Sequence, residues 1–164
     1  TLAAVFFAEI CDMIIVRPPQ AWPEEGRKVF LAGSIEMDQA ADWQDQFAQM
    51  LADTDLVLLN PRRLDWDDTL RHEADEPEFH RQVTWELEGL EAADVIVMYF
   101  DPVTKSPVSL LELGLHARSG RLLVCCPDGF WRRGNVVITC ERYSIPMYPS
   151  LSAMSGAVRR RLPS

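Results

Sequence analysis

The amino-acid sequence predicts a doubly wound α/β fold, in which a parallel β-sheet is sandwiched between helices. Short apolar runs alternate along the chain with longer amphipathic segments, as in consecutive strand–helix–strand units. The chain has 164 residues, which suits one domain of ordinary size. Apolar residues make up 48% and charged residues 25%, so the chain can build a core and is not disordered as a whole.

The segment 1–26 is predicted to be an N-terminal extension and connector. Residues 2–10 are apolar, but the run is too short for a membrane span, and no basic residue precedes it as in a secretory signal. A strand-like run follows at 13–16, and three prolines in the rest of the segment favour an extended connection. A single domain is predicted over 27–164.

The first half of this domain is expected to alternate strand, helix and strand. The apolar run 28–32 is typical of a strand and ends at a glycine. Apolar residues then recur near one face over 38–53, which predicts a helix with Asp38 as its N-cap. A second strand is predicted at 55–59, followed by a long polar loop over 60–75.

The second half continues the same alternation. A helix is predicted at 78–92, where an apolar stripe is formed by Phe79, Val83, Leu87 and Leu90. Ser106 and Pro107 suit the N-cap and first turn of another helix, at 106–118. The remaining expected elements are strands at 95–100, 122–126 and 145–148 and a closing helix at 150–162.

These elements predict a five-stranded parallel sheet of the flavodoxin-like type, with right-handed crossovers and helices on both faces. Ligands of such sheets bind beyond the carboxyl ends of the strands. That rule selects four loops as candidate sites, at 33–38, 60–75, 101–109 and 127–135.

Two carboxylates are the strongest chemical signals. Glu112 interrupts an otherwise apolar helical stretch, where a carboxylate is costly unless it has a partner or a use. Glu86 lies on the preceding predicted helix, so the two side chains are able to converge. A pair of carboxylates suits glycosyl transfer, because one attacks the anomeric carbon while the other manages the proton of the leaving group. The alternative is that Glu112 faces solvent on the polar side of its helix.

The chain also carries four motifs in a fixed order: VFLAGSI at 29–35, WE at 85–86, ADVI at 93–96 and LELG at 111–114. Together, over roughly residues 28–140, they resemble the nucleoside 2-deoxyribosyltransferase family and its relatives, the deoxynucleoside 5′-monophosphate N-glycosidases. The loop NPRR with DWD, within residues 60–67, resembles the transferase-like branch of that superfamily.

The resemblance implies roles for individual residues. Glu112 matches the family's nucleophile, which attacks C1′ to form a deoxyribosyl ester, and Glu86 matches an aspartate that handles the base and its proton. Phe30 stands where both branches have a tyrosine. Ser106 stands where transferases place an aspartate touching the sugar and monophosphate hydrolases place a serine near the phosphate. Asn135 matches an asparagine that transferases lend to a neighbouring subunit's site.

Further substrate-binding residues are predicted in the loops beyond the strands, namely Gly33, Ser34, Asn60, Arg62, Trp66 and Asp101. For the loop at Gly33, a plain turn is the alternative, since it lacks the GxGxxG pattern and the P-loop lysine. Arg62 is able either to clamp a phosphate or to lie in solvent. Trp66 suits stacking on a nucleobase but equally suits anchoring a long loop.

The leading hypothesis is therefore an enzyme that cleaves the N-glycosidic bond of 2′-deoxynucleosides and transfers the sugar to another nucleobase. A hydrolase of deoxynucleosides or their 5′-monophosphates and a non-catalytic nucleotide-binding module are the alternatives. Expected partners are a nucleoside or nucleotide, a free nucleobase and a second copy of the chain, so that the active form is a homo-oligomer.

No metal or redox cofactor is expected, because the ester on the enzyme and protonation of the leaving base supply the chemistry. The four cysteines form no CxxC or Cys/His ligand cluster, which argues against a zinc site. The formal net charge of −9 argues against binding to nucleic acid or a membrane surface. Free thiols are most simply explained by a reducing compartment, so a cytoplasmic location is predicted.

Overall fold

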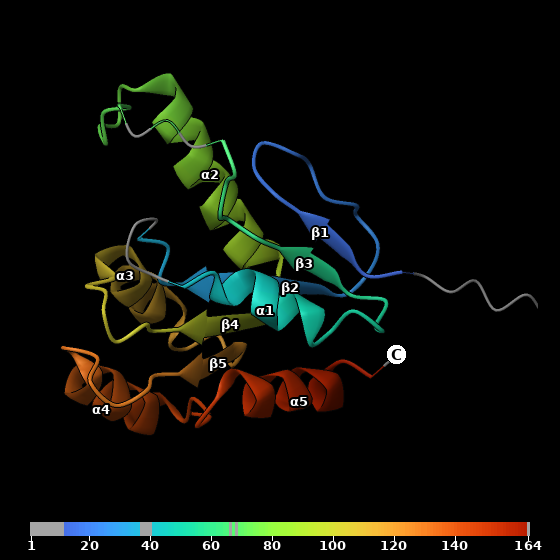
Figure 1. Ribbon diagram of the computed structural model, residues 1–164, viewed down its shortest axis with the longest axis vertical. Coiled ribbons are helices and arrows are strands. Elements are labelled where there is room, and N and C mark those ends of the chain that lie inside the picture. Colours follow the sequence, from blue (N-terminus) through green and yellow to red (C-terminus); the bar gives the residue numbers. More distant parts are fainter. Residues whose placement is uncertain (1–11, 37–40, 66, 68, 164) are drawn as a thin grey trace, which may run out of the picture.

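The structure is a computed structural model that describes residues 12–36, 41–65, 67 and 69–163, and it confirms the predicted fold class (Figure 1). Five parallel strands form one sheet in the order β1-β3-β2-β4-β5. Their bounds are Ile14–Val16 for β1, Lys28–Gly33 for β2, Val57–Leu59 for β3, Val95–Tyr99 for β4 and Leu122–Cys125 for β5.

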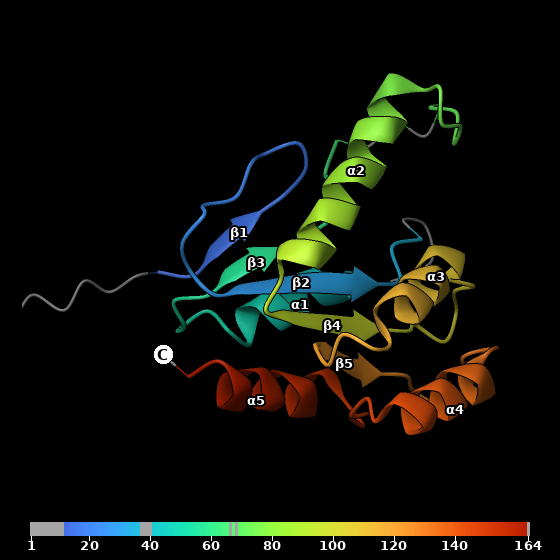
Figure 2. The same cartoon turned by 180° about the vertical axis from the view of Figure 1, so that it is seen from behind.

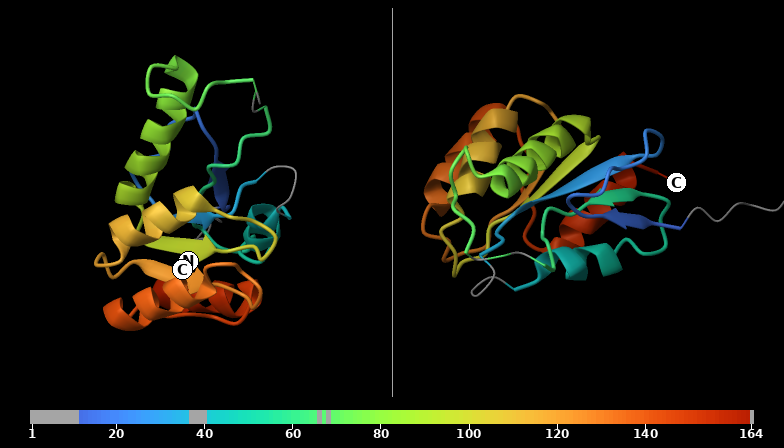
Figure 3. Two further views of the ribbon diagram at one scale, coloured as in Figure 1. Left: turned by 90° about the vertical axis from the view of Figure 1, so that its left-hand side faces the viewer. Right: turned by 90° about the horizontal axis from the view of Figure 1, so that it is seen from above.

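Helices cover both faces of the sheet (Figures 1 and 3). One face packs against α2 (Pro77–Ala92), α3 (Pro107–His116) and α4 (Arg133–Tyr143), and the other against α1 (Trp43–Gln49) and α5 (Leu151–Arg161). The strands supply both cores because successive side chains point to opposite faces. In β2, for example, Phe30 and Ala32 face α2 and α3, whereas Val29 and Leu31 face α1 and α5.

The edge strand β1 lies within the segment predicted as an extension and connector. Ile14, Ile15 and Val16 pair in parallel with Val57, Leu58 and Leu59 of β3. Residues 1–11 lie outside the described part of the chain, and a domain boundary near residue 27 stays a prediction. Of the described helices, none combines the length and the apolar character that crossing a membrane requires.

The predicted strand at 145–148 is wrong, and β1 takes its place as the fifth strand. Met147 forms only an isolated bridge with Val124, through hydrogen bonds from the Val124 amide to the Pro146 carbonyl and from the Tyr148 amide to the Val124 carbonyl. Pro146 and Pro149 have no N–H to donate, so the pairing stops after this bridge.

Two helices differ from the prediction. The first is shorter than expected, and its N-cap is Asp42, whose carboxylate accepts a hydrogen bond of 3.1 Å from the Asp45 amide. Asp38, the predicted cap, lies outside the described residues. Helix α4 is not predicted by the sequence pattern, because it contains a β-branched run and only Val136 and Cys140 are buried. Packing of these two side chains against the sheet overrides the weak local preference.

The apolar stripe predicted on α2 is not the buried one. The helix buries Gln82, Trp85, Gly89 and Leu90, whereas Leu87 is 43% exposed. Trp85 packs edge-on against Trp22 and tilts against Phe30, and its indole N–H donates to the Gln20 carbonyl at 2.8 Å. The loop after β1 thus supplies the partner that rotates this helix away from the expected orientation.

Candidate active site

The two predicted carboxylates lie on α2 and α3, two of the three helices that cover the same face of the sheet. Figure 2 shows α2 and α3 in front of the strands, with α3 beside the carboxyl end of β2. Glu112 lies on the buried side of α3 with Ser109 and Leu113, and it is 7% exposed. Glu86 is partly buried on α2, one residue after Trp85. Glu112 therefore does not face solvent, and the alternative of an exposed side chain on the polar side of its helix is wrong.

Burial and mutual repulsion govern the titration of the pair. Burial, together with the negative charge of Glu86, raises the pKa of Glu112 to about 8. Burial also raises the pKa of Glu86, while a hydrogen bond from Gln82 opposes that rise. Glu112 therefore keeps its proton near neutral pH, whereas the hydrogen bond from Gln82 favours the charged form of Glu86. The pair thus offers one acid and one base to a bound molecule.

Near the start of α3 three buried hydroxyl groups form a closed cluster. The Ser34 hydroxyl lies 2.9 Å from that of Thr104 and 2.6 Å from that of Ser106, and the last two lie 2.7 Å apart. Ser34 also accepts a 2.9 Å hydrogen bond from the Asp101 amide. Ser106 is the N-cap residue, as predicted, but its side chain joins this cluster and caps no helix amide.

A carboxylate from another loop instead binds the two backbone amides that immediately precede the helix. Glu36, in the loop after β2, accepts hydrogen bonds of 2.8 Å from the amides of both Lys105 and Ser106. The N-terminus of a helix attracts anions, because its amides are unpaired and its dipole is positive there. In this chain a side chain of the protein itself places a negative charge beside that N-terminus.

The glycine at the carboxyl end of β2 is required by close packing. Gly33 has a φ of +130°, and a Cβ there would lie 2.3 Å from the Tyr99 carbonyl oxygen. Phe30, three residues earlier, is fully buried, and its ring lies under α2 at the position where a Cβ on Gly89 would clash. Gly33 thus lets the loop approach β4, while Phe30 is a core residue that packs under α2.

Asn60, Arg62 and Asp101 are all buried at the carboxyl ends of their strands, and each has a protein partner. Asn60 accepts a 3.0 Å hydrogen bond from the Arg62 amide, while its own side-chain nitrogen has no partner among the residues that the structure describes. The Arg62 guanidinium lies 3.7 Å from the carboxylate of Asp42. Asp101 accepts from the amides of Ala41 and Val103 at 3.3 and 3.1 Å.

The two remaining predictions concern Trp66 and Asn135. Trp66 lies outside the described residues. Asn135 is exposed on α4, where it lines a groove of about 300 Å³ between α3 and α4 together with Trp131 and Leu110. The groove also touches Leu113, the neighbour of Glu112. The structure thus places Asn135 on the outer side of α3 and α4.

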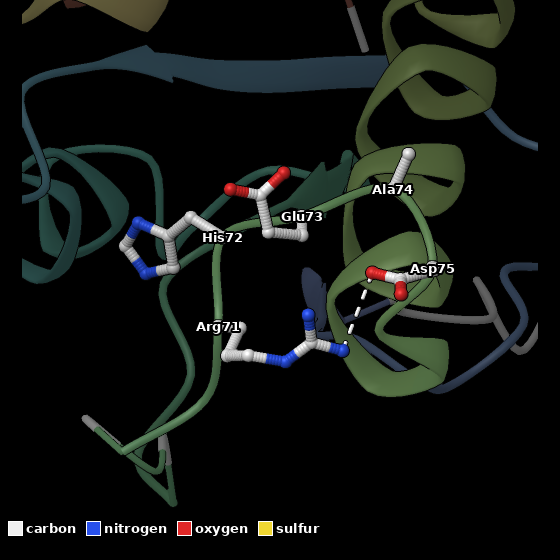
Figure 4. Close-up of a pocket in the computed structure, with 5 residues that line it drawn as sticks. All are labelled: Arg71, His72, Glu73, Ala74 and Asp75. Carbon is white, nitrogen blue, oxygen red and sulfur yellow. Dashed lines mark ion pairs between the residues drawn. The ribbon is translucent and has the colours of Figure 1, made fainter.

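A larger hollow, of about 750 Å³, lies along the loop that leads into α2, and it contains none of the predicted site residues (Figure 4). Its lining is the consecutive run Arg71, His72, Glu73, Ala74 and Asp75. Arg71 and Asp75 form an ion pair across it at 3.3 Å, and both side chains are largely exposed. No described group there combines burial with reactivity, so the glutamate pair is the better candidate site.

Sequence reasoning missed two site residues, Gln82 and Glu36. Both are polar residues that are ordinarily exposed, and neither belongs to a spacing pattern with a known chemistry. The signal that exists for Gln82 is its place four residues before Glu86, which puts the two side chains on one face of a helix.

A comparison with protein families finds a match, which covers more than half of the chain. The family model described as "Nucleoside 2-deoxyribosyltransferase like" matches residues 26–130. The matched segment contains both glutamates, the hydroxyl cluster and Glu36, and it ends before Asn135. A search of curated proteins gives no match to the chain.

Proposed function

The chain belongs to the nucleoside 2-deoxyribosyltransferase-like family, and on that premise we propose that it cleaves the N-glycosidic bond of 2′-deoxynucleosides and transfers the deoxyribosyl group to another nucleobase. The single observation that carries this proposal is the pair of interacting glutamates on α2 and α3, namely a buried Glu112 whose pKa is raised to about 8 and a partly buried Glu86 that accepts a hydrogen bond from Gln82. Glycosyl transfer with retention needs one carboxylate and one carboxylic acid, and this pair supplies both.

In the proposed first step, an ionised Glu112 oxygen attacks C1′ of the sugar. The C1′–N bond breaks, its electron pair goes to the base nitrogen, and Glu86 donates the proton that neutralises the leaving base. In the second step a nitrogen of a different base attacks C1′, the ester bond to Glu112 breaks, and the proton of the incoming base returns to Glu86. Water in place of the second base would make the protein a hydrolase.

Charge at the start of α3 favours a substrate without a 5′-phosphate. By the family resemblance Ser106 lies near the 5′ side of the sugar, and the Glu36 carboxylate occupies the backbone amides of Lys105 and Ser106. A phosphate there would meet a negative charge in place of free N–H groups. The nearby cations are engaged elsewhere: Arg62 faces Asp42, and the Lys105 ammonium lies 4.6 Å from the centre of the Trp131 ring.

We therefore expect Glu36→Gln to weaken discrimination against 5′-monophosphates. The wild type should have a higher kcat/KM for thymidine than for thymidine 5′-monophosphate. In the variant the ratio of these two values should fall by roughly tenfold, because one negative charge is removed beside the 5′ position. Glu25→Gln, at an exposed glutamate, is the matched control. A wild-type preference for the monophosphate would contradict this assignment of Glu36.

The function itself is tested by incubating the protein with thymidine and an excess of free adenine. Formation of deoxyadenosine, detected by chromatography, would establish base exchange. Release of thymine without a new nucleoside would identify a hydrolase. Absence of both, with thymidine and with its 5′-monophosphate, together with retained binding by calorimetry, would favour the non-catalytic module.

We further propose a homo-oligomer in which Asn135 reaches a neighbouring site. The outer side of α3 exposes Val108, Leu111 and Leu115, each more than half accessible, and Ile138 on α4 is similarly exposed. Apolar side chains gathered in this way are typical of an interface. We expect Leu111→Glu to shift the protein toward monomer in light scattering and to lower kcat/KM at least tenfold. A wild type that is monomeric at assay concentration would rule this proposal out.

A further inference from the structure

We propose that Gln82 is a positioning residue, which holds Glu86 in a fixed orientation and determines that the proton shared by the two glutamates rests on Glu112 in the empty site. The inference rests on the proposed function for its catalytic meaning, but the placement of the proton is measurable without turnover. Neither the family match nor the sequence pattern assigns a role to Gln82.

The geometry of the Gln82 amide is determined by its two partners. The side-chain nitrogen donates to a carboxylate oxygen of Glu86 at 2.7 Å and to the Pro61 carbonyl at 3.1 Å. Because both partners are acceptors, the nitrogen and the oxygen of the amide are unambiguously assigned. Pro61 follows β3, so Gln82 ties the loop at the carboxyl end of that strand to the catalytic face of α2.

The other end of the same amide has no partner. Gln82 is 7% exposed, and its side-chain oxygen is buried without a hydrogen bond within the described residues. An unpaired buried carbonyl destabilises a fold, and a leucine of similar volume would avoid that penalty. The contribution of this glutamine therefore lies with its nitrogen, which is directed at Glu86 and Pro61.

A donor aimed at Glu86 acts on one member of the pair only. It stabilises the ionised form of Glu86, whereas Glu112 receives no hydrogen bond from any described side chain and faces the Glu86 charge from across the site. No lysine, arginine or histidine in the described part of the chain forms an ion pair with either glutamate. The aromatic rings of Trp85, which precedes Glu86 in the sequence, and of Phe30, which packs against Trp85, carry no charge.

The preference of the proton for Glu112 determines which step of the proposed reaction must come first. With the proton on Glu112, the nucleophile is neutral and does not attack. The proton must first pass from Glu112 to Glu86, which leaves Glu112 ionised and Glu86 ready to protonate the leaving base. Gln82 thus keeps the empty site in its resting form and holds the proton acceptor in place for that transfer.

The test is the titration of the glutamate carboxyl carbons by NMR, in protein labelled with 13C-glutamate. The Glu86 signal is assigned by its loss in Glu86→Gln. In the wild type we expect Glu86 to ionise in the lower-pH step of the pair and Glu112 in the upper step. In Gln82→Leu we expect the lower step to move up by about one pH unit while the upper step stays in place.

Two further measurements separate this role from a purely structural one. Gln46→Leu, at an exposed glutamine on α1, should leave both steps unchanged, and Gln82→Met supplies a second variant if the leucine variant does not fold. If the protein is active, the acid limb of the plot of kcat/KM against pH should move up in the Gln82 variant together with the lower-pH titration step. The alkaline limb should stay where it is in the wild type. An unchanged Glu86 midpoint in a folded Gln82 variant would overturn the inference. A shifted midpoint in a protein without turnover would support it and count against the proposed function alone.

Discussion

Replacement of Glu112 by glutamine is expected to reduce base exchange at least 10³-fold while the protein remains folded. Glutamine has nearly the same shape, but its amide does not form the ester with C1′. Since Glu112 is buried and its pKa is raised to about 8, a neutral side chain suits its surroundings at least as well as a carboxylate. Lost activity would therefore report lost chemistry and not lost structure.

Three measurements make this prediction specific. Circular dichroism should show native Glu112→Gln protein, and Glu88→Gln, at an exposed position on α2, should retain full activity. Mass spectrometry of acid-quenched wild type incubated with deoxynucleoside alone should detect a deoxyribosyl adduct that the Glu112 variant lacks. Turnover by Glu112→Gln within tenfold of the wild type would show that another group attacks the sugar.

The fold was largely predictable because it depends on patterns that are local in the sequence. Apolar runs such as 28–32 and 122–126 are short and continuous, as buried parallel strands require, and the helices between them are amphipathic. Errors arose where tertiary contacts overrode local preference. Helix α4 contains a β-branched run that argues against a helix, and the edge strand β1 is recognisable only from its pairing with β3.

The candidate site was predictable only in part. Glu112 was recognisable because a carboxylate within an apolar helix needs a reason, and its approach to Glu86 followed from their places on helices flanking one strand. Glu36 was not recognisable, and the only signal for Gln82 was its spacing from Glu86, since the other hydrogen bonds of both residues join groups that are distant in the sequence. The position of Trp66 relative to the site stays a prediction.

The second large effect concerns stability against pH. The ordinary pKa of a glutamate is 4.5, and in the folded protein that of Glu112 is about 8. Between these two pH values the folded state keeps a proton that the unfolded state has lost, so the free energy of unfolding falls as pH rises from 4.5 to 8. Glu112→Gln lacks this titration. We expect the variant to exceed the wild type in stability by roughly 2–4 kcal/mol at pH 8.5, with a difference that shrinks toward pH 5.

Thermal unfolding of both proteins from pH 5 to pH 8.5 tests this directly. The Tm difference should grow with pH and reach roughly 5–10 °C in favour of Glu112→Gln at the alkaline end. Glu88→Gln should follow the wild type throughout, because it removes an exposed carboxylate. If the Tm of Glu112→Gln and that of the wild type changed in parallel with pH, Glu112 would titrate as an ordinary glutamate, and its surroundings would not disfavour the charged form. A Tm difference that grows with pH, combined with lost turnover, would show that Glu112 destabilises the folded protein and is nevertheless needed for the reaction. That combination is expected for a catalytic group and not for a core residue.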